Sequence, residues 1–461
     1  MNTTRTLFLG LIFFSLIYSC NKNEVTATAT SINDTTVTRP APPYPHPRQV
    51  QRPGPPNIIF VLGDDVGYEM PTFDGGQSYN TSHLDSLAAN SMVFTQCHAT
   101  PLCSPSRVEL LSGLYNFRNY LKHGWGVYDT QFISYVKVLQ NNGYKTCVVG
   151  KWQLGDWDIG LDKVGFDDYC VLNPSGNLYR SPTLLDEFGK LPPSATQNKF
   201  SEDITGDYAM NFIDQNKNTP FFMYYSFMLI HVPDQPTPLD ANFQSFDDNT
   251  SDTTYIGSMT HYLDIKVGIL MNKLKADGLD KNTIIVFAGD NGSQGNFHSI
   301  YKGKEVAGEK GFPTELGTHV PLLVNWPGHI MPGTNDNLVD FSDFAPTFLD
   351  MANIKNKPPG DGVSFYPQLF GQNGTARSWI YDYYDPFPVV GPNGQRPSQP
   401  RSFAQDTAYK LYKTDSVGLR AGKFFHFTVD PEEKIPLRDN QLTPAQAAIK
   451  QKLQAALAGL P

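Results

Sequence analysis

The chain has few cysteines and no excess of basic residues. Its 461 residues include 5 cysteines, none in a CxxC spacing, which argues against a disulfide scaffold and a cysteine-ligated zinc site. A formal net charge of -9 excludes a broad surface for nucleic acid or anionic membranes, since either would need a basic excess. We therefore expect no nucleic-acid partner, and an anionic substrate would need a locally basic pocket.

The chain also begins without an apolar run long enough to span a bilayer comfortably. Arg5 precedes an apolar stretch at 7–18, which has the length and flanks of a secretory signal. The letters IYSC at 17–20 resemble a bacterial lipoprotein box, in which Cys20 becomes the lipidated mature N-terminus. We expect export to the periplasm or cell surface as a lipid-anchored lipoprotein; an ordinary signal peptide with an incidental cysteine is the alternative.

Composition divides the chain into four parts, and no internal repeat is visible. These are a signal peptide at 1–20, a Thr/Pro-rich tether at 21–56, a large α/β domain at 57–376 and a smaller domain at 377–461.

The large domain alternates apolar β-rich runs with helical patterns, which predicts a mostly parallel central sheet flanked by helices. After about residue 377, short aromatic or β-branched runs are separated by turn residues, as in an antiparallel sheet. A terminal helix is predicted from Pro444 to about Leu457, with Thr443 as its N-cap.

Polar residues follow four of the predicted strands at the point where each strand ends. Ligand sites in open α/β sheets lie beyond the carboxyl ends of the strands, so we expect these residues to meet in one crevice. Taken singly, each could instead be a turn residue or a helix cap. They are Asp64 and Asp65, Lys151 and Gln153, His231, and Asp290 and Asn291.

Three of these strand-end residues are carboxylates, and Asn291 adds an amide oxygen. A ligand set made only of oxygen suits a hard cation, and the mixture of carboxylates with an amide carbonyl favours Ca²⁺ over Mg²⁺. The sequence therefore predicts a calcium site formed by Asp64, Asp65, Asp290 and Asn291.

Cys103 stands directly in front of a predicted helix in the stretch PLCSPSRVELLSG, residues 101–113. Ser104 or Ser106 can cap this helix, and the helix dipole favours an anion at the position of the thiol. A thiol there could be a nucleophile of low pKa, a small buried hydrophobe or the precursor of another group. The residues alone leave these alternatives open.

The chain resembles the type I sulfatases of the alkaline-phosphatase-like superfamily, over about residues 57–437. The signature CSPSR at 103–107 is similar to the Cys-x-Pro-Ser-Arg motif of that family and is the most specific of the matches. Other similar blocks are NIIFVLGDDVGYE, GKWQLG, HVP, GDNG, KGFPTELGTHVPLLVNWPG, FSDFAPTFLDMANI and PGDGVSFYPQLFG.

The resemblance implies that Cys103 is oxidised before folding to formylglycine by a sulfatase-maturing enzyme. The hydrated aldehyde would attack sulfur, expel the alcohol and then collapse to release sulfate. Cys103 would also complete the shell of one Ca²⁺. Arg107 would anchor the nucleophile, Lys151 and Lys310 would bind sulfate oxygens, and His231 would protonate the leaving oxygen.

Gln153 departs from the family's usual Gly-Lys-Trp-His-Leu-Gly block. A glutamine offers hydrogen bonds but no titratable base, so we expect Gln153 to orient the nucleophile while another group takes the proton. A neutral replacement is the alternative. His98 and His298 are weaker candidates to line the pocket.

The predicted function is hydrolysis of sulfate monoesters, on sulfated polysaccharides or oligosaccharides. The carbohydrate substrate is inferred from export and tethering. The alternatives are a phosphonate monoester or phosphodiester hydrolase of the same superfamily, and a non-catalytic relative that binds sulfated glycans.

Overall fold

The computed structural model describes residues 54–123, 128–155, 160–173, 176–386 and 399–461. The predicted signal peptide, Cys20 and nearly all of the predicted tether lie outside these ranges. Within them, no helix has both the length and the apolar character needed to cross a membrane.

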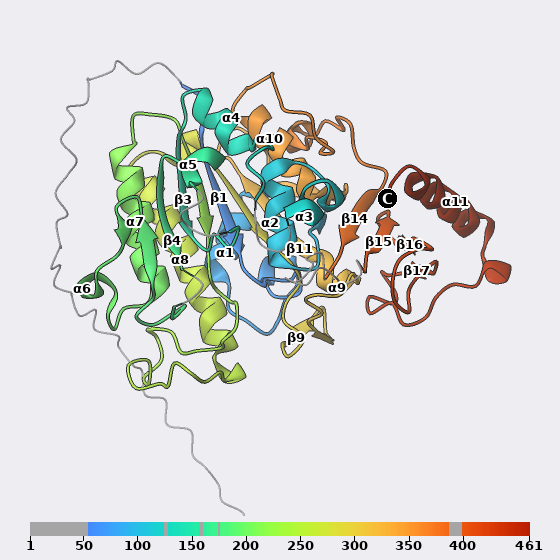
Figure 1. The fold of residues 1–461 in the computed structure, drawn as a ribbon, viewed down its shortest axis with the longest axis horizontal. Helices are drawn as coiled ribbons and strands as arrows, with labels where there is room; N and C mark the ends of the chain where they lie inside the picture. The colour runs from blue at the N-terminus through green and yellow to red at the C-terminus, as the bar shows by residue number, and fades with distance from the viewer. Residues whose placement is uncertain (1–53, 124–127, 156–159, 174–175, 387–398) are drawn as a thin grey trace, which may run out of the picture. The chain divides into compact units, whose positions relative to one another are not determined.

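The large sheet has 11 strands, and its centre is parallel (Figure 1). β1 (Asn57–Gly63) lies between β8 (Thr283–Gly289) and β7 (Phe221–Ser226), and β7 pairs in turn with β3 (Lys145–Gly150). All three of these pairings are parallel. Every residue of β1, β7 and β8 is buried, which explains why they appear in the sequence as continuous apolar runs.

Further strands extend the sheet on both sides. Beyond β3 come β4 (Asp168–Leu172), β5 (Leu184–Asp186) and β6 (Gly189–Lys190). Beyond β8 come β11 (His319–Asn325) and β2 (Ser91–His98), followed by β12 (Gly333–Asn335) and β13 (Val339–Asp340), both paired to β2. β11 is antiparallel to both neighbours, so the sheet is mixed.

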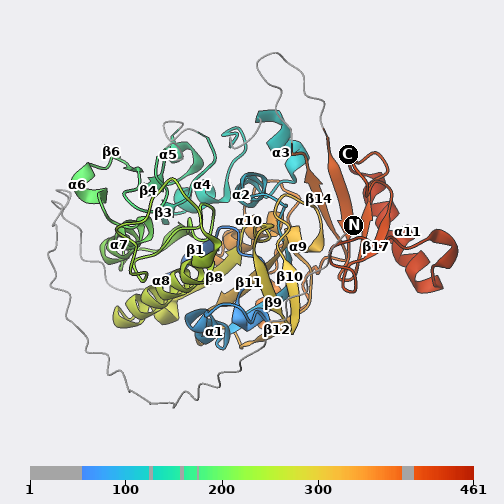
Figure 2. The same ribbon diagram turned by 90° about the horizontal axis from the view of Figure 1, so that it is seen from below.

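Helices cover both faces of this sheet, because alternate residues of each strand point to opposite sides. Ile58, Phe60 and Leu62 of β1 pack in one core with α2 (Cys103–Ser112), α4 (Tyr135–Asn141) and α10 (Phe344–Met351). Ile59 and Val61 pack in the other with α1 (Ser82–Ala88), α7 (Ser201–Gln215) and α8 (Ile256–Ala276). Figure 2 shows α1 and α8 on one side of the strands and α2 and α4 on the other.

The predicted C-terminal antiparallel sheet is confirmed, and it belongs to the same compact unit as the large sheet. Its strands follow chain order: β14 (Ile380–Tyr384), β15 (Arg401–Gln405), β16 (Tyr409–Tyr412) and β17 (Phe424–His426). The terminal helix α11 (Pro444–Ala458) begins after Thr443, whose side chain caps it as predicted. Leu453 and Leu457 of this helix pack on the outer face of the sheet.

One element was not predicted, and one prediction was wrong. A two-stranded sheet, β9 (His298–Tyr301) with β10 (Lys304–Ala307), follows the end of β8. The expectation that Ser104 or Ser106 caps α2 is wrong. The helix already begins at Cys103, with Leu102 as N-cap and no side-chain cap. Ser106 lies inside the first turn, where its hydroxyl contacts Thr100 and the Leu102 carbonyl.

Candidate active site

The carboxyl ends of β8, β1, β7 and β3 lie next to one another, because these strands are consecutive neighbours in the sheet. The structure thereby brings the predicted strand-end residues together. Ligand atoms of Asp64, Cys103 and Asp290 lie within 4.8 Å of one another, and so do those of Asp64, Asp65 and His231.

Asp64, Asp65, Asp290 and Asn291 form what we call the strand-end cluster, and all four are buried. The Asp65 backbone N–H donates to Asp290 Oδ1 at 3.0 Å, and Asn291 Nδ2 donates to Asp65 Oδ1 at 2.8 Å. These bonds hold the residues that follow β1 against those that follow β8, although Asp65 and Asp290 are 225 residues apart in sequence.

The electrostatic environment shifts the pKa values of Asp290 and Asp65 in opposite directions. Burial and the negative charge of Asp64 raise the pKa of Asp290 to about 6, against the opposing effect of Arg107. Burial also acts to raise the pKa of Asp65, but the positive charges of Lys310 and Lys151 outweigh it and hold that pKa below its usual range. Crowded carboxylates of this kind are stabilised by cations.

Arg107 is completely buried, and its donors are directed at the protein. Nε and Nη2 donate to Asp290 Oδ2 at 3.0 and 2.7 Å, and Nη1 donates to Ser226 Oγ at 2.6 Å and to the Lys151 carbonyl at 3.1 Å. Arg107 therefore ties together α2 and the ends of β8, β7 and β3. The anchoring of a nucleophile by Arg107 stays a prediction.

Both predicted sulfate-binding lysines lie on the strand-end cluster. Lys151 Nζ donates to Asp64 Oδ2, and Lys310 Nζ lies 2.6 Å from Asp65 Oδ1. Lys151 and Lys310 are almost fully buried. They form a locally basic site at the strand ends, although the chain is acidic overall.

Cys103 occupies the first position of α2, and 3% of its surface is exposed. Burial raises the pKa of its thiol, in spite of the opposing effects of Lys151 and Lys310. The unmodified side chain is therefore a protonated thiol at neutral pH, and a thiolate nucleophile is disfavoured.

His231 and Gln153 lie on the same edge. His231 Nδ1 lies 2.6 Å from the Val232 carbonyl, and burial together with Lys151 lowers the pKa of the ring to about 3. Gln153 has a positive φ of 62°, and its Oε1 is buried without a hydrogen-bond partner among the described residues. An oxygen held in this way is available to a ligand.

Sequence reasoning missed several residues that support the site. Gln294 Nε2 donates to Asp65 Oδ2 at 2.8 Å, and Ser226 Oγ accepts a hydrogen bond from Arg107 Nη1. A polar residue closing the apolar run FFMYYS was a usable signal for Ser226. His98 is buried against Gln405, and His298 is exposed on β9 beside Glu305.

The loop that carries Lys310 is held in place by contacts with the C-terminal sheet and Glu433. Lys410 Nζ and the Tyr412 hydroxyl donate to the Pro313 carbonyl at 2.9 and 2.8 Å, and Glu433 Oε1 accepts from the Glu315 backbone N–H at 3.1 Å. Lys410 and Glu433 also pair at 2.8 Å. We call Lys410, Tyr412 and Glu433 the loop clamp.

The strand-end cluster fits a calcium ion. Asp64 Oδ1 and Asn291 Oδ1 are buried and have no hydrogen-bond partner in the described part of the chain. Leaving such atoms unsatisfied is costly, and a cation would satisfy both. The thiol sulfur of Cys103 is a poor ligand for a hard cation, whereas an oxygen at this position would complete an all-oxygen set.

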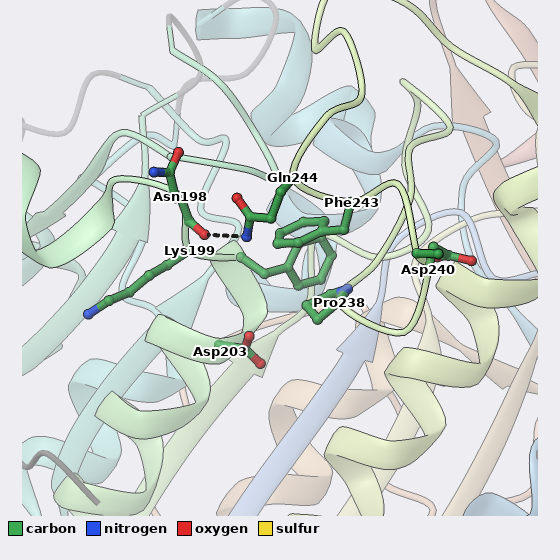
Figure 3. A pocket seen from close by; sticks show the side chains of 9 residues that line it. Asn198, Lys199, Asp203, Pro238, Asp240, Phe243 and Gln244 are labelled. Carbon is green, nitrogen blue, oxygen red and sulfur yellow. Dashed lines mark hydrogen bonds between the residues drawn. The ribbon is translucent and has the colours of Figure 1, made fainter. Parts of the chain in front are cut away.

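A cavity of about 420 Å³ lies outside this cluster, between α7 and the segment 238–244 (Figure 3). Phe200 and Phe243 contribute aromatic surface to it, and Gln244 Nε2 donates across it to the Asn198 carbonyl at 3.1 Å. None of the strand-end residues lines this cavity, so it is not the site of the chemistry.

The mixed sheet with helices on both faces and its polar site at the strand ends agrees with the alkaline-phosphatase-like fold expected from the sequence. A profile of the sulfatase family matches residues 56–354, and one described as N-sulphoglucosamine sulphohydrolase, C-terminal, matches residues 308–459. The chain belongs to the sulfatase family and is a sulfuric ester hydrolase.

Individual relatives agree with this assignment. The chain is 29% identical to arylsulfatase G of Rattus norvegicus over 382 residues, which cover 71% of each chain. It is 26% identical to N-acetylgalactosamine-6-O-sulfatase of Bacteroides thetaiotaomicron, over 70% of this chain and 78% of the relative. The fold is also similar to a solved complex with D-glucosamine-2-N,6-O-disulfate, with TM-score 0.71, 21% identity and coverage of 88% and 98%.

Proposed function

We propose that this sulfatase removes sulfate from sulfated carbohydrates, using a formylglycine made from Cys103 and one bound Ca²⁺. The observation that carries the proposal is the position of Cys103 among Asp64 and Asp290, with two orphaned oxygens and two lysines beside it. The carbohydrate substrate is supported by relatives named for sugar sulfates.

Formylglycine and Ca²⁺ have separate tasks in the proposed mechanism. Formylglycine at position 103 would supply a nucleophilic oxygen and an internal route for releasing sulfate. Asp64, Asp65, Asp290, Asn291 and residue 103 would hold Ca²⁺, which when bound would supply Lewis-acid polarisation of the sulfate ester.

The chain's own residues bind and orient the substrate. Lys151 and Lys310 neutralise sulfate oxygens through charge-assisted hydrogen bonds, and Arg107 holds Asp290 in place. Gln153 offers its unpaired Oε1 to orient the nucleophile. His231 transfers a proton to the leaving oxygen; its protonation needs a negative charge nearby, and a bound sulfate ester is one.

The decisive experiment combines mass spectrometry with sulfate release. We expect active protein to carry formylglycine at position 103 and to release sulfate from sulfated mono- or oligosaccharides. An aryl sulfate and a phosphodiester serve as comparison substrates. Cys103→Ala should be inactive, while Cys97→Ala, which removes another buried thiol on β2, should keep its activity. Active protein with an unmodified thiol throughout would overturn the mechanism.

Maturation and location complete the proposal. Burial of the Cys103 side chain in the folded chain supports modification by a sulfatase-maturing enzyme before folding. We further propose lipid attachment at Cys20 and residence in the periplasm or at the cell surface. Wild type should fractionate with membranes and Cys20→Ala should not; two equally soluble proteins would contradict the anchor.

A further inference from the structure

The inner face of the C-terminal sheet ends beside the candidate active site. Ile380 pairs with Gln405 and Tyr384 with Arg401, and alternate residues of each strand share a face. Gln405 Nε2 lies 3.2 Å from a ring nitrogen of His98 on β2, so this face is turned toward the large sheet. Tyr384 and Arg401 lie on the same face at the far end of β14 and β15.

The Lys310 loop fixes where this pair lies. A methyl group built on Gly311 would lie 4.0 Å from the Tyr384 hydroxyl oxygen. The Gly311 N–H donates to the Pro101 carbonyl at 2.7 Å, two residues before Cys103. Tyr384 therefore lies beside the loop that carries Lys310, and this loop contacts the segment that precedes α2.

Arg401 differs from the other described arginines in the folded unit. Five of them lie against a carboxylate: Arg107, Arg118, Arg180, Arg377 and Arg420. Arg438 has no such contact, but it is exposed to water. Arg401 is half-buried, and among the described residues neither its guanidinium nor the Tyr384 hydroxyl has a hydrogen-bond or ion-pair partner. A partly desolvated cation without a counter-ion is costly unless a ligand supplies one.

We propose that Tyr384 and Arg401 bind a second anionic group of the substrate, a carboxylate or a second sulfate, while the scissile sulfate lies at Lys151 and Lys310. This rests on the proposed function and narrows its substrate class to sulfated sugars with a further negative charge. A guanidinium recognises a carboxylate or a sulfate through two parallel N–H donors. Burial raises the pKa of Tyr384 to about 12, although Arg401 opposes it, so the hydroxyl keeps its proton and can donate.

The test measures binding in a chain that cannot turn over, Cys103→Ala, with Ca²⁺ present. The ligands are glucosamine 6-sulfate, glucosamine 2-N,6-O-disulfate and a 6-sulfated disaccharide carrying a uronate. Their dissociation constants are determined by calorimetry for Cys103→Ala alone and combined with Arg401→Ala, Arg401→Lys, Tyr384→Phe or Arg438→Ala. The last change removes an exposed arginine of the same C-terminal region and serves as the matched control.

We expect Arg401→Ala to weaken at least one two-anion ligand roughly ten- to a hundredfold and the monosulfate less than about threefold. Arg401→Lys should recover part of the loss, Tyr384→Phe should cause a smaller one, and Arg438→Ala none. The disulfate and the uronate disaccharide distinguish a sulfate from a carboxylate as the second group.

Equal weakening of all three ligands, or of none, would overturn this proposal and leave the proposed function standing. If no sugar binds while the matured wild type hydrolyses an aryl sulfate, the carbohydrate substrate fails, and this inference fails with it. Thermal melting of each variant shows whether a loss reflects unfolding.

Discussion

The strand-end cluster and the loop clamp are both buried and charged, but they differ in how their polar atoms are satisfied. In the cluster, Asp64 Oδ1 and Asn291 Oδ1 have no partner within the described residues. In the clamp, both carboxylate oxygens of Glu433 are engaged, by Lys410, Tyr412 and the Glu315 N–H. A cluster with orphaned oxygens is completed by a ligand, whereas one with paired atoms positions other parts of the protein.

The largest effect should come from breaking the cluster. We expect Asp64→Asn to lower turnover roughly a thousandfold, because it removes a predicted cation ligand and the negative charge that pairs with Lys151. Calcium at 100 times its dissociation constant should raise the free energy of unfolding of the wild type by about 2.7 kcal/mol, and that of the variant by much less. Calorimetric melting with and without calcium measures this, with the exposed Asp214→Asn as control. Equal stabilisation of Asp64→Asn would place the ion elsewhere.

Breaking the clamp should cost stability before it costs chemistry. Lys410→Met leaves the buried Glu433 with only Arg420, whose Nε lies 3.6 Å from Oε2, so we expect a loss of about 3 kcal/mol in the free energy of unfolding. The double variant Lys410→Met/Glu433→Gln should regain much of this, and urea denaturation measures both. The KM for sulfate esters should rise because the Lys310 loop loses its support. The exposed Lys423→Met is the control, and a double variant as unstable as the sum of its singles would contradict the pairing.

A third buried carboxylate sharpens the comparison. Glu202 Oε1 accepts the backbone N–H groups of Met228 and Leu229, and burial raises its pKa from 4.5 to about 7. Because the folded pKa is raised, this group's contribution to stability is full below pH 4.5 and is lost as the pH rises through 7.

Glu202→Gln keeps an acceptor for both N–H groups but cannot ionise. We expect its stability relative to wild type to increase between pH 4.5 and 8, by on the order of 3 kcal/mol. Denaturation curves across this range test the sign, with the exposed Glu305→Gln as control. A difference that does not change with pH would mean that Glu202 is ionised throughout.

The smallest effect concerns Gln153, whose orphaned Oε1 places it with the cluster. Loss of one orienting group costs about 1–3 kcal/mol, so Gln153→Ala should slow turnover roughly ten- to a hundredfold. Rapid-mixing assays on an aryl sulfate should show a burst of phenol in the wild type, because we expect sulfate release to be slow when position 153 offers no base. The exposed Gln372→Ala is the control. An unchanged rate together with no burst would leave Gln153 without this role.

The strand-end residues could be located from the sequence because each is a polar residue directly after an apolar run, which marks the end of a strand. The strand order placed them together, and Cys103 stood out through its signature. The start of α2 was misjudged because two serines are good caps, although the helix begins earlier, at Cys103.

The loop clamp and Arg401 could not be predicted from the sequence. Lys410 lies in the run AYKLYKTD and Glu433 in DPEEK, both typical of solvated strands and turns. Only packing of the C-terminal sheet against the 313–315 backbone buries them. Arg401 is distinguished by what it lacks, a carboxylate partner, and that depends on every neighbour in space.

The bond from Glu433 to the Glu315 N–H, across 118 residues, has a consequence for synthesis on the ribosome. A nascent chain that has emerged as far as Asn325 contains every predicted catalytic and metal-binding residue. It lacks the strands that support the Lys310 loop, so we expect the predicted sulfate-binding geometry to be completed only when the last part of the chain follows. Partial products released early would therefore carry the whole signature and remain without activity, and contacts of such long range form late in folding.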